Sequence, residues 1–318
     1  MSRRAAEGRP QAARKAMNPA EPERLAVYEY DRRSNYEQDT HLTSALDALL
    51  PEAELTHPDQ RLFQTIHLIT EYAWCGMHFE MRRAAALLRE GDHLFAARIL
   101  ARAAAVGAIP VQALRIMIGY LPQHSLLTMR ETFPENTTGL DSPGARNLRR
   151  MASVLYQAFA GELERYGLTL TELIAQDGRV AAAAETDRAA TQLAVVRQAL
   201  LDLDAAVSEW RQTHLRLVWV QLGGHPSASE RAGRPATASE GDGQPHPFVA
   251  GPEDAGQPHP STAPPQRDGN QCPALPLSLS GQSISNLRQI AERSLFPQLW
   301  DSIDATYRIF TTTSEVSR

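Results

Sequence analysis

The stretch LDAAVSEWRQTHLRLVWVQLG, from Leu203 to Gly223, carries the clearest structural signal in the chain. Its apolar residues recur every three or four positions, which is the spacing of one face of an α-helix. The same spacing begins near Glu185 and continues to Leu222, and it places His214 inside a long helix. We expect this helix to form part of the core.

The rest of the chain shows the same helical periodicity. Residues 59–89 carry an apolar stripe that predicts a second long helix, and we expect this helix to be central in the fold.

 We predict further helices at about 93–107, 111–121, 144–166 and 168–175, separated by Gly and Pro residues, and two more at 283–293 and 296–309. No run of alternating apolar and polar residues indicates strands. Long helices with short connections are typical of a bundle, so the sequence predicts an all-α fold.

Two segments are expected to lie outside this fold. Residues 1–21 are rich in Ala, Arg, Glu and Pro and predict a disordered basic arm. Residues 223–278 are rich in Pro, Gly, Ser and Thr and predict a disordered insertion, because such a segment buries too little apolar surface to offset its loss of conformational entropy. The predicted domain therefore consists of residues 22–222, completed by C-terminal helices within residues 279–318.

Composition sets aside several classes of protein. The chain has 318 residues, 42% of them hydrophobic, which is enough for one complete core. Its formal charge of -5 lacks the clustered basic signature of a nucleic-acid-binding protein. We find no apolar run near the roughly 20 residues that cross a bilayer and no secretory signal, so we predict a cytoplasmic protein without membrane contact. Cys75 and Cys272 do not form a disulfide framework.

Two of the ten histidines, His67 and His214, lie inside long, mostly apolar helices. An imidazole on an inward helical face can bind a metal or heme iron through one ring nitrogen, while an acceptor holds its other N–H. The competing interpretation is a hydrogen-bonded core histidine. The HExxH, paired CxxC, P-loop and GxSxG signatures are missing, and the CxxH formed by Cys75 and His78 has no second pair.

Two helical segments share residues with one enzyme family. SEWRQTHLRLVWVQLGG resembles the helix of the tryptophan 2,3-dioxygenases that binds heme iron from the proximal side, with matches at Trp210, Arg211 and His214. RLFQTIHLITEYAW is similar to the family's helix with a distal histidine. Its matching positions are Leu62, Phe63, His67 and Glu71.

Two further segments match the same family in order along the chain. LPQHSLLTMRETFPENTTGLDSPGAR resembles the family's substrate loop, with matches at Arg130, Thr138, Gly139 and Arg146. NLRQIAERSLFPQLWDSI resembles its C-terminal Leu-Arg helix and Phe-Pro-x-Leu-Trp turn, with matches at Leu287, Arg288, Phe296, Pro297, Leu299 and Trp300. The resemblance covers about residues 40–222 and 280–310 and implies a helical heme-binding bundle of the tryptophan 2,3-dioxygenase type.

The resemblance also implies roles for five residues. His214 would bind the iron of a noncovalent heme b, and His67 would be the catalytic residue on the opposite face. Phe63 would form a wall against an aromatic ring, Arg130 would bind an amino-acid carboxylate, and Thr138 would contact the ammonium group or a heme propionate. Family members are tetramers, so we expect a homo-oligomer, a tetramer or a dimer.

The chain departs from the family in places that bear on its substrate. The family's Gly-Thr-rich loop is replaced by the insertion at 223–278, its tyrosine-rich motif by NYEQDTHLTSALDALLP, and the interval from Arg130 to Gly139 is one residue longer. These differences indicate a divergent oxygenase that uses dioxygen or peroxide on tryptophan or a modified tryptophan, by indole dioxygenation or oxindole formation, in secondary metabolism. Two alternatives stay open: a peroxide-using hydroxylase of a tyrosine-like amino acid, and a non-catalytic helical binding protein.

Overall fold

A computed structural model describes residues 15–30, 40–133, 142–176, 185–225 and 284–316. Most of these residues are helical, which confirms the all-α prediction for the described part of the chain. The only strands in this part are β1 (Lys15–Ala16) and β2 (Glu29–Tyr30), which pair antiparallel.

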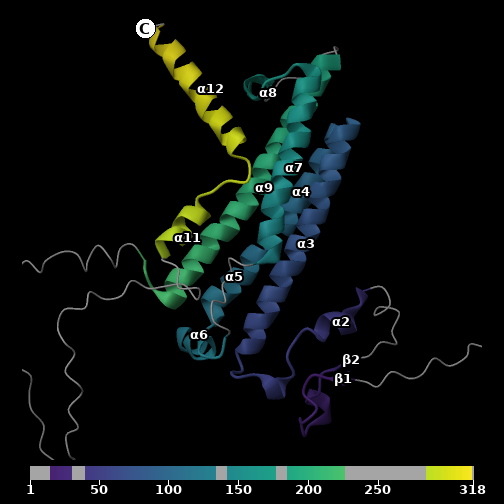
Figure 1. Ribbon diagram of the computed structural model, residues 1–318, viewed down its shortest axis with the longest axis vertical. Coiled ribbons are helices and arrows are strands. Elements are labelled where there is room, and N and C mark those ends of the chain that lie inside the picture. The colour runs from purple at the N-terminus through teal and green to yellow at the C-terminus, as the bar shows by residue number, and fades with distance from the viewer. Residues whose placement is uncertain (1–14, 31–39, 134–141, 177–184, 226–283, 317–318) are drawn as a thin grey trace, which may run out of the picture.

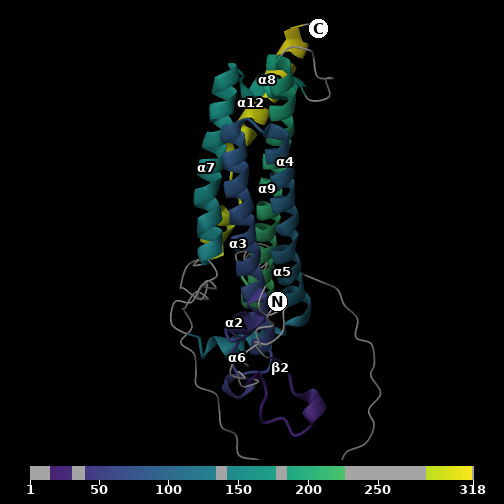
Figure 2. The same ribbon diagram turned by 90° about the vertical axis from the view of Figure 1, so that its right-hand side faces the viewer.

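Long helices lie side by side in an elongated bundle (Figures 1 and 2). They are α3 (Gln60–Glu90), α4 (His93–Val106), α5 (Ala108–Tyr120), α7 (Pro143–Tyr166) and α9 (Glu185–Leu222). Helix α3 packs against α4, α5 and α7, and α9 packs against α4 and α5. The bundle therefore places α3 and α9, which carry the two candidate histidines, in one core.

Capping residues set the ends of these helices. Helix α3 stops at Gly91 and α7 at Gly167, and both glycines adopt positive φ angles of 81° and 63° that close the last turn. At the start of α7, the Ser142 hydroxyl accepts a hydrogen bond of 3.1 Å from the Ala145 N–H, and Pro143 occupies the first turn. The Gly and Pro punctuation seen in the sequence thus sets the helix boundaries.

The C-terminal helices complete the bundle. Helices α11 (Ile284–Ala291) and α12 (Pro297–Val316) contact α9 and the short helix α8 (Leu170–Gln176), respectively. Asp204 of α9, which is fully buried, accepts hydrogen bonds of 2.8 Å from the Leu295 N–H and from the Trp300 indole N–H. This carboxylate fixes the turn between α11 and α12 to the centre of α9.

The structure differs from the sequence predictions in three segments. Helix α6 (Gln123–Arg130) occupies the start of the expected substrate loop, because Leu126 and Met129, one turn apart, both bury their side chains. Helix α2 (Leu42–Leu46) and the two strands are too short to show periodicity in the sequence. Residues 15–21, assigned to the basic arm, include β1, whereas residues 1–14 and 226–283 lie outside the described residues.

The stretch His93–Tyr120, which spans α4 and α5, is long and apolar enough to cross a membrane by length and composition alone. The sequence analysis divides this stretch into two helices, at about 93–107 and 111–121 on either side of Pro110, so it does not stand out there as one apolar run. A proline is tolerated in the first turn of a helix, and Pro110 lies in the first turn of α5. Of the most apolar part of this stretch, 44% is buried inside the bundle. The absence of membrane contact and the cytoplasmic location remain predictions.

Candidate functional site

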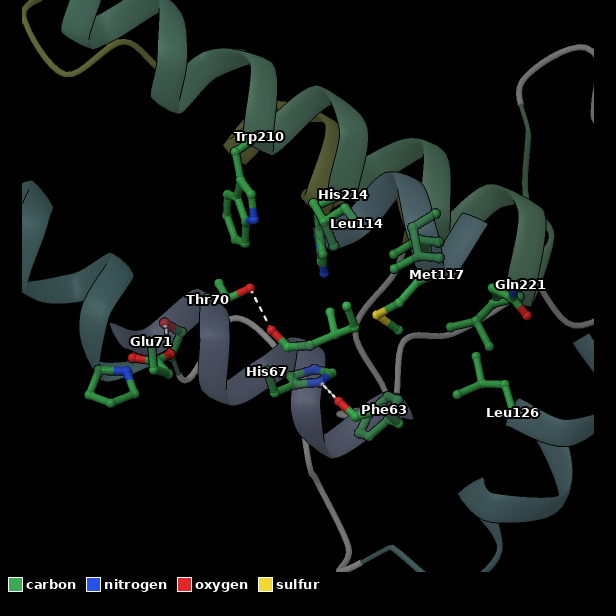
Figure 3. A pocket seen from close by; sticks show the side chains of 16 residues that line it. Phe63, His67, Thr70, Glu71, Leu114, Met117, Leu126, Trp210, His214 and Gln221 are labelled. Carbon is green, nitrogen blue, oxygen red and sulfur yellow. Dashed lines mark hydrogen bonds between the residues drawn. The ribbon is translucent and has the colours of Figure 1, made fainter. Parts of the chain in front are cut away.

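A cavity of about 360 Å³ lies between α3 and α9, with α5, α6 and the start of α7 at its edges (Figure 3). Its volume is in the range of small-molecule binding sites. Helix α3 contributes Phe63, Ile66, His67, Thr70 and Glu71 to the wall. Helix α9 contributes Trp210, His214, Leu217, Val218, Gln221 and Leu222. On each helix these positions follow the three- and four-residue spacing of one face, so the cavity lies where two helical faces meet.

The ring of His67 is held in one orientation by its own helix. Its Nδ1 lies 2.7 Å from the carbonyl oxygen of Phe63 (Figure 3). A carbonyl only accepts hydrogen bonds, so we assign the proton to Nδ1, which leaves the lone pair of the neutral ring on Nε2. The ring also packs on Phe63, with 4.1 Å between ring centroids. His67 can therefore accept a hydrogen bond from a ligand in the cavity.

Burial lowers the pKa of His67 below its usual value, and the Phe63 hydrogen bond and the charge of Glu71 oppose this shift only in part. Burial also lowers the pKa of His214 to about 4, with a further contribution from the nearby His67. Both imidazoles are therefore neutral near pH 7. By accessible surface His67 is an exposed residue and His214 is half-buried, and both side chains line the cavity.

The side chain of His214 projects from α9 into the cavity, toward the helix that carries His67 (Figure 3). Its ring is stacked on Trp210, with 5.3 Å between centroids and 17° between planes, and Trp210 meets Trp74 edge to face at 5.1 Å. These aromatic contacts fix the direction of the imidazole. A neutral, oriented imidazole facing an open space is the form of histidine that binds a metal.

Glu71 joins α3 to the start of α7. One carboxylate oxygen accepts the Gly144 N–H at 2.9 Å, and the other accepts the Ser142 hydroxyl. A negative charge at this position is favourable because the N-terminus of a helix carries partial positive charge. The helices approach so closely that a Cβ on Gly144 would lie 2.5 Å from Cβ of Trp74. Glu71 thus positions the cavity wall.

The structure brings three of the five expected site residues together: Phe63, His67 and His214 all line the cavity. Arg130 ends α6 and is not among the described residues that line the cavity, because α6 turns Leu126 toward it instead. Thr138 lies outside the described residues. The roles expected for Arg130 and Thr138 remain predictions.

Sequence analysis missed Gln221, a polar residue in the cavity wall that is only 1% exposed. Its side-chain Nε2 donates a hydrogen bond of 2.8 Å to the Leu121 carbonyl oxygen, while Oε1 is buried without a hydrogen-bond partner. Its position, seven residues after His214, puts both side chains on one face of α9. That spacing on an otherwise apolar face was the signal available in the sequence.

No protein-family profile matches the chain, and a comparison with curated proteins finds no similar sequence. Within the described ranges, no group of three or more His, Cys, Asp or Glu side chains could hold a metal ion. The cavity offers imidazoles instead. One imidazole is sufficient for an iron that a porphyrin already holds, so the donors present fit a heme better than a bare ion.

Proposed function

We propose that this protein is a heme-dependent oxygenase that inserts oxygen into an aromatic amino acid, either tryptophan or a modified tryptophan. The observation that supports it most is the meeting of two neutral imidazoles, His67 from α3 and His214 from α9, at one largely apolar cavity (Figure 3). The resemblance to the tryptophan 2,3-dioxygenases supports the choice of cofactor and substrate.

The residues around His214 suit a porphyrin. His214 would hold the iron, since burial keeps its imidazole neutral and Trp210 fixes its plane. Apolar side chains such as Leu217 and Met117 form the surrounding wall, which suits the faces of a flat hydrophobic ring. A bound heme supplies the iron chemistry that activates dioxygen or peroxide.

The opposite wall would hold the substrate. Nε2 of His67 can accept a hydrogen bond from an indole N–H, and its lowered pKa keeps it in the accepting form at neutral pH. Phe63 presents an aromatic ring beside it, and this ring also contacts Phe133 at 5.1 Å between centroids. His67 and Phe63 would orient an aromatic ring and keep water from it.

The test is oxygen uptake and product mass for the heme-loaded protein with tryptophan, methyltryptophan and tyrosine. We expect oxygen to enter the indole substrates, and His67→Ala to lower turnover by about 100-fold or more while heme stays bound. His78→Ala, on the same helix but not in the cavity wall, is the matched control and should keep normal turnover.

The other outcomes contradict this proposal in distinct ways. A product from tyrosine alone would identify a peroxide-using hydroxylase of a phenolic amino acid. A protein that binds no heme and yields no product would be a helical binding protein.

A further inference from the structure

A second hollow, of about 560 Å³, lies at the start of α7. It is lined by Pro143 and by four polar side chains: Arg146, Asn147, Arg149 and Arg150. Pro143 also lines the cavity between α3 and α9, so the two hollows share a wall. A ligand too long for the apolar cavity would therefore meet arginines at its edge.

The position of these arginines is unfavourable for the helix itself. They occupy the first two turns of α7; the helix dipole disfavours cations in the first turn, and that turn has no acidic residue. The ion pairs found among the described residues involve other arginines, namely Arg83, Arg102, Arg115, Arg165 and Arg288. Arg150 donates a hydrogen bond of 2.5 Å to Oδ1 of Asn147. No described carboxylate thus forms an ion pair with Arg146 or Arg149.

More positive charge lies across the helix interface. Burial lowers the pKa of Arg211 on α9; the charge of Asp204 opposes this shift, and the charges of Arg149 and Arg293 add to it. The nearby carboxylates already have partners, because Glu71 binds the start of α7 and Asp204 binds the turn before α12. Positive charge gathers here without a matching acid in the described part of the chain, and a surface lined by one sign of charge attracts an ion of the opposite sign.

We propose that Arg146, Arg149 and Arg150 bind a carboxylate of the ligand whose apolar part lies in the cavity. Guanidinium groups hold carboxylates by paired hydrogen bonds. The identity of the ligand rests on the proposed function, and two of its components carry the required group: the propionates of a porphyrin and the carboxylate of an amino acid. This cluster takes the carboxylate-binding role that the family resemblance gives to Arg130.

The test is a set of calorimetric titrations of the full chain with two pairs of compounds. Hemin is compared with hemin dimethyl ester, and L-tryptophan with L-tryptophanamide, the second pair both with and without hemin. In each pair the second compound lacks the free carboxylate. The variant R146Q/R149Q/R150Q is compared with R82Q/R89Q/R98Q, which removes the same charge from exposed positions on α3 and α4.

We expect the cluster variant to raise the Kd of hemin or of L-tryptophan by about tenfold or more, and to change that of the carboxylate-free partner by less than about twofold. The compound that loses affinity identifies which carboxylate is bound. Equal losses within a pair, equal losses in the control variant, no loss, or no binding to the wild type would each overturn the proposal. Failure of the proposed function is detected separately, because the protein would then show no heme absorption band. In that case the titration with L-tryptophan in the absence of hemin still tests whether the arginines bind a carboxylate.

Discussion

Histidines lie near both ends of α3, and their surroundings differ. Just beyond the C-terminal end, His93 is 2% exposed and its Nε2 lies 2.7 Å from Oε2 of Glu162. In the first turns, His67 and the facing His214 line a cavity, and the adjacent carboxylate, Glu71, is engaged by α7. The first arrangement closes a core, and the second leaves lone pairs facing an open space. What the ring nitrogens face separates a structural histidine from a candidate ligand.

The largest expected effect on stability comes from the closed end. His93→Ala leaves the Glu162 carboxylate buried without its main partner, so we expect the free energy of unfolding to fall by about 3–5 kcal/mol in urea denaturation. His67→Ala should cost about 1 kcal/mol or less, since its ring faces a cavity. The double variant H93A/E162L should recover part of the loss. Similar losses for His93→Ala and His67→Ala would remove the distinction between the two ends.

A smaller effect is expected where the cavity wall is anchored. Gly144→Ala would force a methyl group against Trp74 and Glu71, and overpacking of this kind lowers stability by about 1–3 kcal/mol. Gly161→Ala, on the same helix in open space, should instead raise it by about 0.5–1 kcal/mol. Thermal unfolding of both variants measures the difference. Equal changes would mean that α7 and α3 do not approach closely at Gly144.

The smallest effect concerns pH. The pKa of His214 is about 4 in the folded protein and near 6.5 when unfolded, so the unfolded chain binds protons first as pH falls. The free energy of unfolding is therefore unaffected by this group above pH 6.5 and decreases as pH falls toward 4. We expect a loss of about 1–2 kcal/mol at pH 5 for the heme-free protein. His67, whose pKa is also lowered, acts in the same direction. Urea unfolding at pH 7 and pH 5 should show a smaller decrease in H67A/H214A than in the wild type. An equal decrease would contradict the assigned burial.

Much of the fold could be predicted from the sequence because it depends on local signals. Apolar spacing identified the long helices, and Gly91 and Gly167 marked helix ends that need positive φ angles. The predicted helix begins at about 111, just after Pro110, whereas α5 begins at Ala108 because a proline is tolerated in the first turn. The short helix α6 escaped notice, since one pair of buried residues gives no periodicity.

In the candidate site, too, the residues with local sequence signals could be predicted, whereas features that depend on tertiary packing could not. Phe63, His67 and His214 could be predicted because each lies on an inward helical face and matches a motif. The spacing of Gln221 from His214 was visible in the sequence, but its hydrogen bond to Leu121 depends on how α9 meets a distant part of the chain. Arg146 matched the substrate loop, but its place in a hollow with Arg149 and Arg150 depends on the packing at the start of α7. The structural role of Glu71 was hidden for the same reason: its partners, Ser142 and Gly144, are more than 70 residues away in the chain.

The most direct test of the central claim, that the imidazole of His214 binds heme iron, is the absorption spectrum of the protein titrated with hemin. We expect a Soret band in the wild type and in His78→Ala, and its loss or a clear shift in His214→Ala, with circular dichroism showing that all three fold. A His214→Ala protein that binds hemin with the wild-type affinity and spectrum would contradict the account.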